Sequence, residues 1–332
     1  MTSPAQKTSA LRTLRHCAGV LVVGILWACG IATTAQAGLT GSFLYNLAGF
    51  TGPILFSGVR VAVDEKTREV YVCDPTQGSV ILFNEQGMEV FRFGDDERLG
   101  QVYDVAVQDD GTILLLSYFP SERGMNDRDF SIVRCNFRGE PLGRIEMSGL
   151  PEGFERFGPS RLVLRDGVIY LASEGSMRVV AADGQGSVQR SWNLPALLEM
   201  TEQEIADTGL GGFAVDADGS LLFTVPATAK AYRLSPAGAL ESFGKRGSAP
   251  GRFGVVNGVG VDAQGNAYVV DTLRCVVLAF DRSLKFVTEF GHRGGGPGGL
   301  VAPIGVAVAS WGRVYVSQNA RRGVSVFQVA VN

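Results

Sequence analysis

The stretch VNGVGVDAQGNAYVVDT, Val256–Thr272, decides the fold. It consists of a short apolar strand, an Asp-x-x-Gly turn that begins at Asp262, and a second apolar strand that ends at Asp271. A turn of this kind between two alternating strands predicts a β-hairpin. Because a single hairpin is only marginally stable in water, the fold depends on how often the pattern recurs.

The pattern recurs in six copies, and a new copy begins roughly every 45 to 50 residues, which is the period of a four-stranded propeller blade. Two copies share the same intervals of nine and then eleven residues between their landmark residues: Asp74, Phe83 and Gly94, and Asp271, Phe280 and Gly291. The sequence therefore predicts an all-β, six-bladed β-propeller of four-stranded antiparallel blades. We expect the blades near residues 52–94, 95–147, 148–194, 195–244, 245–291 and 292–332.

The last copy has room for only three strands before the chain ends at Asn332. The segment SFLYNLAGF, within residues 39–50, matches the fourth-strand pattern KFVTEFG. We therefore expect the N-terminal strand to complete the last blade, which would close the ring and remove its open edges.

Several motifs resemble NHL repeats, namely GVGVDAQGNAYVVDT, VVLAFDRSLKFVTEFG and the linking segment GSAPGRFG. The resemblance is close for the copies that begin near Ser57 and Val256, and it covers nearly all of the chain after residue 37. It implies a six-bladed propeller that serves mainly as a binding platform. The fifth copy departs from the NHL pattern because Asn257 stands where the linking segment normally has proline.

Residues 1–37 have the pattern of an export signal. Lys7, Arg12 and Arg15 precede the apolar run AGVLVVGILWACGIA, and a small-x-small site ends at Ala37. This predicts a signal peptide cleaved after Ala37 and a periplasmic or secreted protein. Two alternatives are a lipid anchor on Cys29, within the lipobox-like Leu26–Cys29, and a retained anchor, although the apolar run is shorter than the roughly 20 residues that span a bilayer.

After residue 37 the chain has 27 basic and 33 acidic residues, a net charge of −6. This balance argues against nucleic acid as a partner. We expect a monomer with no membrane span after signal removal, and an envelope or secreted protein as its partner. Cys73, Cys135 and Cys275 are odd in number, so at least one thiol is unpaired. Cys73 and Cys275 lie in apolar segments predicted as strands, where cysteine acts as a small buried hydrophobe.

Two insertions interrupt the regular spacing. FPSERGMNDRD, Phe119–Asp129, is predicted as a charged loop in the second blade. Before the fourth blade, a short helix is predicted from about Thr201, whose spacing to Glu204 is that of a capping box. Insertions in repeat proteins often lie on one face and bind partners, but they are also simply tolerated there.

The sequence offers no clear catalytic group. His292 is the only histidine after residue 37, and a single imidazole cannot build the multi-histidine sites of the propeller lyases that resemble this repeat. Asp64, Asp216 and Asp262 occupy turn positions, where aspartate caps its own backbone. We therefore assign no catalytic residue, no metal ligand and no cofactor, and a Ca²⁺ ion in the channel remains an alternative.

One row of residues is predicted to line a mouth of the central channel, at the start of each innermost strand: Gly58, Asp104, Arg161, Gly212, Gly258 and Gly305. The glycines would widen the mouth and let backbone approach a ligand. Asp104 and Arg161 could form a salt bridge between adjacent blades, or Arg161 could bind an anionic group while Asp104 holds it. An arginine beside Asp104 would lower the pKa of its carboxyl, which favours binding over acid–base catalysis.

Arg60, Arg252 and Arg274 are further candidates, for a protein-interaction surface. Together these features favour a non-catalytic exported propeller that acts as a protein-binding or scaffold module in the cell envelope. Two alternatives remain open. One is a lactonase- or lyase-like enzyme with a cation held in the channel by Asp104 and backbone carbonyls. The other is a sensor of a small anionic ligand at Arg161.

Overall fold

A computed structural model shows the architecture of the chain, which divides into two units, Met1–Gln36 and Ala37–Asn332. Its description covers residues 39–50, 52–53, 58–121, 128–155 and 157–331 of the second unit. The predicted signal peptide, with Cys29 and Ala37, lies outside these residues. No helix among the described residues is long and apolar enough to cross a membrane.

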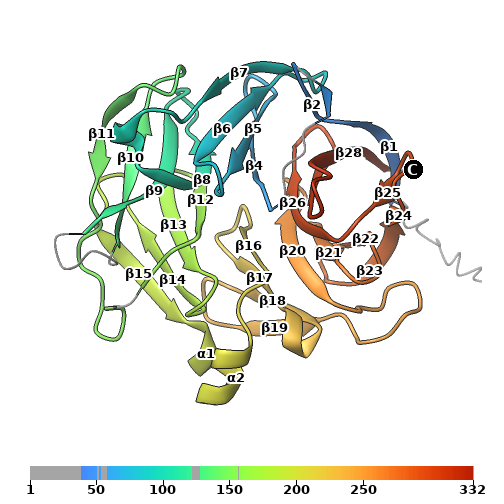
Figure 1. Ribbon diagram of the computed structural model, residues 1–332. Coiled ribbons are helices and arrows are strands. Elements are labelled where there is room, and N and C mark those ends of the chain that lie inside the picture. Colours follow the sequence, from blue (N-terminus) through green and yellow to red (C-terminus); the bar gives the residue numbers. More distant parts are fainter. Residues whose placement is uncertain (1–38, 51, 54–57, 122–127, 156, 332) are drawn as a thin grey trace, which may run out of the picture. The chain divides into compact units, whose positions relative to one another are not determined.

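Within the described residues, six four-stranded antiparallel sheets form the blades of a propeller (Figure 1). Blade 1 contains β4 (Arg60–Asp64), β5 (Glu69–Asp74), β6 (Ser79–Phe83) and β7 (Glu89–Phe93). Blade 2 contains β8 (Gln101–Val107), β9 (Ile113–Pro120), β10 (Arg128–Cys135) and β11 (Pro141–Ile145). Blade 3 contains β12 (Arg161–Arg165), β13 (Val168–Ser173), β14 (Arg178–Ala182) and β15 (Val188–Asn193).

The second half of the ring repeats this order. Blade 4 contains β16 (Gly212–Val215), β17 (Leu221–Val225), β18 (Lys230–Leu234) and β19 (Leu240–Phe243). Blade 5 contains β20 (Val256–Val261), β21 (Ala267–Asp271), β22 (Val276–Phe280) and β23 (Phe286–Phe290). Blade 6 contains β26 (Pro303–Val308), β27 (Arg313–Gln318), β28 (Val324–Val331) and β1 (Leu39–Asn46).

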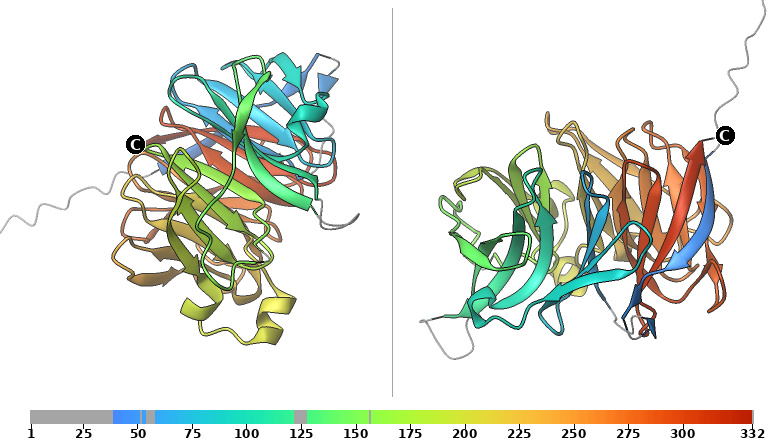
Figure 2. Two further views of the ribbon diagram at one scale, coloured as in Figure 1. Left: turned by 90° about the vertical axis from the view of Figure 1, so that its left-hand side faces the viewer. Right: turned by 90° about the horizontal axis from the view of Figure 1, so that it is seen from above.

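The N-terminal strand closes the ring, as predicted. β1 pairs antiparallel with β28 from Leu39 opposite Val331 to Asn46 opposite Ser325, and the two strands lie side by side in Figure 2. The ring of Phe43 meets that of Phe327 edge-on, with centroids 5.8 Å apart. Because the two ends of the chain belong to one sheet, the last blade has its full four strands and the ring has no open end.

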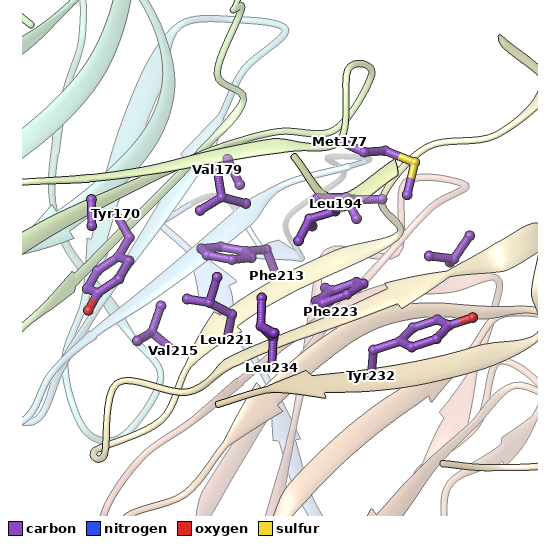
Figure 3. Packing of buried hydrophobic residues seen from close by; sticks show 14 residues of the cluster. Tyr170, Met177, Val179, Leu194, Phe213, Val215, Leu221, Phe223, Tyr232 and Leu234 are labelled. Carbon is purple, nitrogen blue, oxygen red and sulfur yellow. The ribbon is translucent and has the colours of Figure 1, made fainter. Parts of the chain in front are cut away.

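The hydrophobic core consists of six clusters, each between two consecutive blades, as counted over the described residues. Figure 3 shows the cluster between blades 3 and 4, where Tyr170 and Val179 pack near Phe213 and Phe223. The middle strands are apolar at nearly every position and buried along their length because each blade has a neighbour on both faces. A single blade would leave these faces exposed, so the blades are stable only together.

Short elements lie between the long strands. They are β2 (Ala48–Gly49), β3 (Gly52–Pro53), η1 (Glu97–Leu99), α1 (Leu194–Leu197), α2 (Glu202–Asp207), η2 (Pro226–Thr228), β24 (His292–Arg293) and β25 (Gly299–Leu300). All of them except η2, which lies within blade 4, connect blades. The predicted helix is α2, and its capping box is confirmed. The Thr201 hydroxyl accepts from the Glu204 backbone N–H at 3.3 Å, and the Glu204 carboxylate accepts from the Thr201 backbone N–H at 2.9 Å.

The other insertion differs from its prediction. Phe119 and Asp129 are not loop residues, since β9 extends to Pro120 and β10 begins at Arg128, and Phe119 pairs with Asp129 across this hairpin. The hydrogen-bonded ladder continues into the charged segment because strand pairing does not require apolar side chains beyond the core. The remaining residues of the predicted loop, 122–127, lie outside the described residues.

All three cysteines of the described chain are free and buried. Cys73 lies in β5, as predicted. Cys275 does not lie in a strand. It ends the turn before β22 with a φ of 59°, and its backbone N–H donates to the Asp271 carbonyl at 2.9 Å. Burial raises the pKa of the Cys73 thiol well above its usual value, so this cysteine is a structural hydrophobe.

Candidate functional site

A cavity of about 210 Å³ lies where the innermost strands of all six blades meet. These first strands, β4, β8, β12, β16, β20 and β26, each pair on one side only and lie nearest the centre in Figure 1. Their free edges face the axis, so backbone N–H and C=O groups are available along the channel. The charged residues that line the cavity are Arg60, Asp104 and Arg161.

Strand pairing corrects the predicted row at the channel mouth. Asp104, Arg161, Gly212 and Gly305 pair with equivalent positions of their second strands: Leu116, Ala172, Thr224 and Ser317. Gly258 lies in the bulge of β20 just before Val259, which pairs with Val269. In blade 1 the equivalent residue is Arg60, which pairs with Cys73, and Gly58 lies two residues earlier. The hairpin turns differ in length, so aligning glycines misplaced blade 1.

Arg60 and Arg161 converge on one carboxylate, that of Glu174, which follows the last residue of β13. Arg60 Nη2 lies 3.1 Å from Glu174 Oε1 and 2.9 Å from Oε2, and Arg161 Nε lies 2.9 Å from Oε1. The hydroxyl of Ser160 donates to Oε2 at 3.0 Å. Because Arg60 belongs to blade 1 and Glu174 to blade 3, this carboxylate links two blades that are not consecutive in the ring.

Burial alone would raise the pKa of the Glu174 carboxyl, but Arg161, Arg60 and the hydrogen bonds outweigh it, and the pKa is lowered. The pKa of Arg60 is lowered by burial and by the neighbouring charge of Arg161, against the opposing effect of Glu174. Glu174 is therefore ionised at neutral pH, and it balances part of the positive charge of two closely placed guanidinium groups.

Asp104 does not form the predicted ion pair with Arg161, whose carboxylate partner is Glu174. Asp104 Oδ2 accepts the Leu162 backbone N–H at 2.9 Å, and Oδ1 accepts that of Val105 at 2.9 Å. Arg161 lowers the pKa of the Asp104 carboxyl, as expected, but the net shift is upward. Burial raises the pKa of the Asp104 carboxyl and outweighs Arg161, Arg60 and the two backbone hydrogen bonds. Asp104 thus joins blade 2 to the first strand of blade 3.

The three glycines of blades 4 to 6 lie where neighbouring atoms are close, and Gly258 and Gly305 also line the cavity. A Cβ on Gly212 would lie 2.7 Å from the Cα of Gly258, and a Cβ on Gly258 would lie 2.6 Å from the Cα of Gly305. A Cβ on Gly305 would lie 2.5 Å from Ser317 Oγ. For Gly212 and Gly258 the approaching backbone is that of the next blade, so these two glycines permit close contact between blades, whereas Ser317 belongs to the same blade as Gly305.

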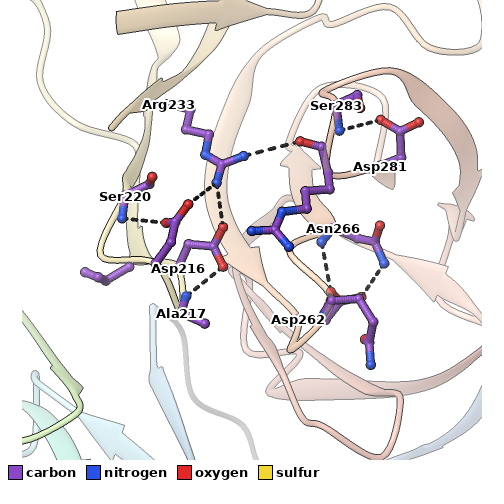
Figure 4. A network of polar contacts seen from close by, with 12 residues as sticks. Asp216, Ala217, Ser220, Arg233, Asp262, Asn266, Asp281 and Ser283 are labelled. Atoms are coloured by element: carbon purple, nitrogen blue, oxygen red, sulfur yellow. Dashed lines mark hydrogen bonds and ion pairs between the residues drawn. The ribbon is translucent and has the colours of Figure 1, made fainter. Parts of the chain in front are cut away.

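The acidic residues in turns and at strand ends have the predicted capping roles. Asp64 and Asp262 each accept the backbone N–H two residues on, at 2.8 and 2.9 Å, and Asp74 does so at 2.9 Å. Asp216 differs because it accepts the N–H of the next residue and pairs with Arg233 at 3.0 Å (Figure 4).

Two of the three arginines proposed for an interaction surface are engaged within the fold. Arg60 lies at the channel mouth, and Arg274 pairs with Glu289 at 2.6 Å and donates to the Arg252 carbonyl. Arg252 is exposed. His292 is exposed in β24, which pairs in parallel with β25. Among the described residues, no group of three or more His, Cys, Asp or Glu is arranged to hold a metal ion.

Comparison with known proteins shows the fold alone. No protein-family model matches the chain, and no curated protein matches it. A solved structure of a protein of unknown function from Bacteroides thetaiotaomicron is 12% identical over 88% of this chain and 76% of that chain, with a TM-score of 0.64. A gluconolactonase from Xanthomonas campestris is 14% identical over 90% and 93%, with a TM-score of 0.56.

A streptogramin B lyase is also similar, at 14% identity over 89% of this chain and 98% of that chain, with a TM-score of 0.52. The chain is therefore a six-bladed β-propeller whose structural neighbours have different activities. Identities this low carry no activity across, since one fold supports many functions. The site must be interpreted from its own residues.

Proposed function

We propose that the protein binds a small oxyanion, a carboxylate or a phosphate, in the channel beside Arg60 and Arg161, without catalysis of its own. The observation that carries this proposal is the convergence of Arg60 and Arg161 from different blades on one carboxylate. Arginine presents a planar set of donors that suits carboxylate and phosphate groups.

Both guanidinium groups keep unused donors. Arg161 uses only Nε toward Glu174, and its two Nη groups have no hydrogen bond to any described residue. Arg60 uses only Nη2, and its Nε is buried without a partner in the described part of the chain. Arg161 lines the cavity, so a bound anion that accepts from its unused Nη groups would add charge-assisted hydrogen bonds.

The size and composition of the site favour a small polar ligand. The cavity of about 210 Å³ is below the usual range of pockets for drug-sized ligands. The single exposed histidine and the two engaged oxygens of Asp104 provide no free general base beside the arginines. These features support a sensor or carrier of an anionic metabolite over a lactonase or lyase.

The test is a calorimetric titration of the purified protein with acetate, malonate and inorganic phosphate at constant ionic strength. At least one anion is expected to bind, and Arg161→Ala should weaken that binding about tenfold or more because it removes a charged donor. Arg190→Ala is the matched control, since Arg190 lies on the outer strand of the same blade and stacks on Trp192. If none of the three anions binds, the proposal is wrong.

We also propose that the propeller works outside the cytoplasm, which the pattern of residues 1–37 supports. N-terminal sequencing of the protein from a cell-envelope or culture fraction should begin at Gly38. A protein starting at Met1 in the cytosolic fraction would contradict export.

A protein-binding role is the second candidate, supported by one outer strand and by the NHL resemblance. On β7, Val90 and Phe91 are 43% and 40% exposed, and the preceding Met88 is 57% exposed. An apolar edge strand of this kind is typical of sites where another chain adds. Cross-linking in the envelope fraction should yield an adduct that Phe91→Asp abolishes, and an unchanged adduct would exclude this edge.

A further inference from the structure

We infer that Glu174 occupies the anion site as an internal carboxylate and thereby makes it selective for small dianions, dicarboxylate or phosphate, over monocarboxylates. This inference rests on the proposed function and specifies the class of ligand. Glu174 is not among the residues that line the channel cavity. It contacts Arg60 and Arg161, which do line the cavity.

The carboxylate of Glu174 already accepts the hydrogen bonds that a ligand carboxylate would accept at this site. Oε1 accepts from Arg60 and Arg161, and Oε2 accepts from Arg60 and Ser160, all within 3.1 Å. Each oxygen therefore has two donors, which is close to the capacity of a carboxylate. The side chain is 27% exposed, so solvent and ligands reach it.

The backbone holds Glu174 in this place from two sides. Its N–H donates to the Ser160 hydroxyl at 3.2 Å, and its carbonyl accepts the Leu210 N–H at 2.9 Å. Gly209 lies against the same carbonyl, since a Cβ there would be 2.6 Å from the oxygen. Leu210 ends the insertion that carries α1 and α2, so that insertion fixes the position of Glu174 at the mouth.

A monocarboxylate gains little by replacing Glu174. It would make the hydrogen bonds that Glu174 already makes, and it would lose translational freedom that a residue of the chain does not lose. A dianion can do more. One of its anionic groups can replace Glu174 while the other accepts from the Nη groups of Arg161, which lines the cavity. The second anionic group therefore accounts for the tighter binding of dianions than of monocarboxylates.

The experiment compares acetate, malonate and inorganic phosphate on the parent protein and on Glu174→Gln, at constant ionic strength. The parent should bind malonate or phosphate about tenfold more tightly than acetate. In Glu174→Gln the internal competitor is uncharged, so acetate should bind about tenfold more tightly than it does to the parent. The ratio of the affinity for the dianion to the affinity for acetate should therefore be smaller in Glu174→Gln than in the parent. The three ligands distinguish a dicarboxylate site from a phosphate site.

Glu289→Gln is the matched control. Glu289 also holds an arginine with both oxygens, Arg274 at 2.6 and 2.9 Å, but it lies in blade 5 away from the channel cavity. The Glu289→Gln variant should bind every anion with the same affinity as the parent. Ser160→Ala removes one donor to Glu174 and should raise acetate affinity by a smaller factor. It also provides a second variant if Glu174→Gln folds poorly.

The outcomes separate this inference from the proposed function. If the parent binds acetate as tightly as malonate and phosphate, and Glu174→Gln does not change this, the site binds anions but Glu174 does not select them. If Glu174→Gln binds acetate and the parent does not, the inference stands in its strongest form. If a folded parent and a folded Glu174→Gln bind none of the three anions, the proposed function fails and the inference fails with it.

Discussion

Blades 1 to 3 and blades 4 to 6 use the same position of their innermost strands in opposite ways. In the first half this position holds Arg60, Asp104 and Arg161, and in the second half it holds the three glycines Gly212, Gly258 and Gly305. The charged half brings side chains to the channel, whereas the glycine half brings the backbones of neighbouring blades into contact.

The difference shows how a ring of similar blades can hold a site on one side. Where a side chain is present, its volume must be accommodated between blades, and its charge must be balanced, here by Glu174. Where it is absent, the backbones of neighbouring blades approach closely, and the cavity is lined there without a charged side chain. The glycine half therefore contributes to stability, and the charged half contains the groups that can bind a ligand.

The largest effect is expected from adding a side chain to the glycine half. In Gly258→Ala the new Cβ would lie 2.6 Å from the Gly305 Cα and 2.7 Å from the Ile304 carbonyl oxygen, and neither atom can move without its strand. We expect the free energy of unfolding to fall by about 3 kcal/mol, measured by urea denaturation.

The control for this prediction is Gly143→Ala in the outer strand β11, where no atom lies near the position of the new Cβ. It should leave the stability nearly unchanged. If Gly258→Ala unfolds at the same urea concentration as the parent, blades 5 and 6 do not depend on close contact at this position.

A smaller effect is expected from neutralising the charged half with Glu174→Gln. The folded-state pKa of Glu174 is lowered from 4.5, so its stabilisation is present above that pH and is lost as the pH falls through the folded-state pKa. We expect the variant to be less stable by about 1 to 2 kcal/mol at neutral pH, and the difference to shrink in acid. A difference that grows in acid would contradict this assignment.

Asp104 should show the opposite pH trend and the smallest effect at neutral pH. Its folded-state pKa is raised from 3.8, so its contribution is complete below that pH and is lost as the pH rises through the raised value. Asp104→Ala should therefore cost more stability in acid than at neutral pH, where we expect about 1 kcal/mol. Thermal unfolding of both proteins across this pH range tests it. Parallel pH profiles would show that Asp104 does not change its protonation on folding.

The candidate site was only partly predictable from the sequence. Asp104 and Arg161 stood out because the other predicted members of the row are glycines. Arg60 was predicted for an interaction surface and not for the channel row, where Gly58 was placed instead, because hairpin turns of different lengths hide the register. Glu174 gave no periodic signal, since it follows a strand end and reaches a residue 114 positions earlier in the chain.

The sequence by itself determined the six repeats, the antiparallel hairpins and the completion of the last blade by the N-terminal strand. These follow from alternating apolar residues and turn residues, which act over a few neighbours along the chain. Only the tertiary structure decided that Arg60 and Arg161 share Glu174, that Asp104 joins two blades, and that three glycines bring backbones together. Such contacts depend on strand register and ring closure, which place residues distant in sequence within hydrogen-bond distance.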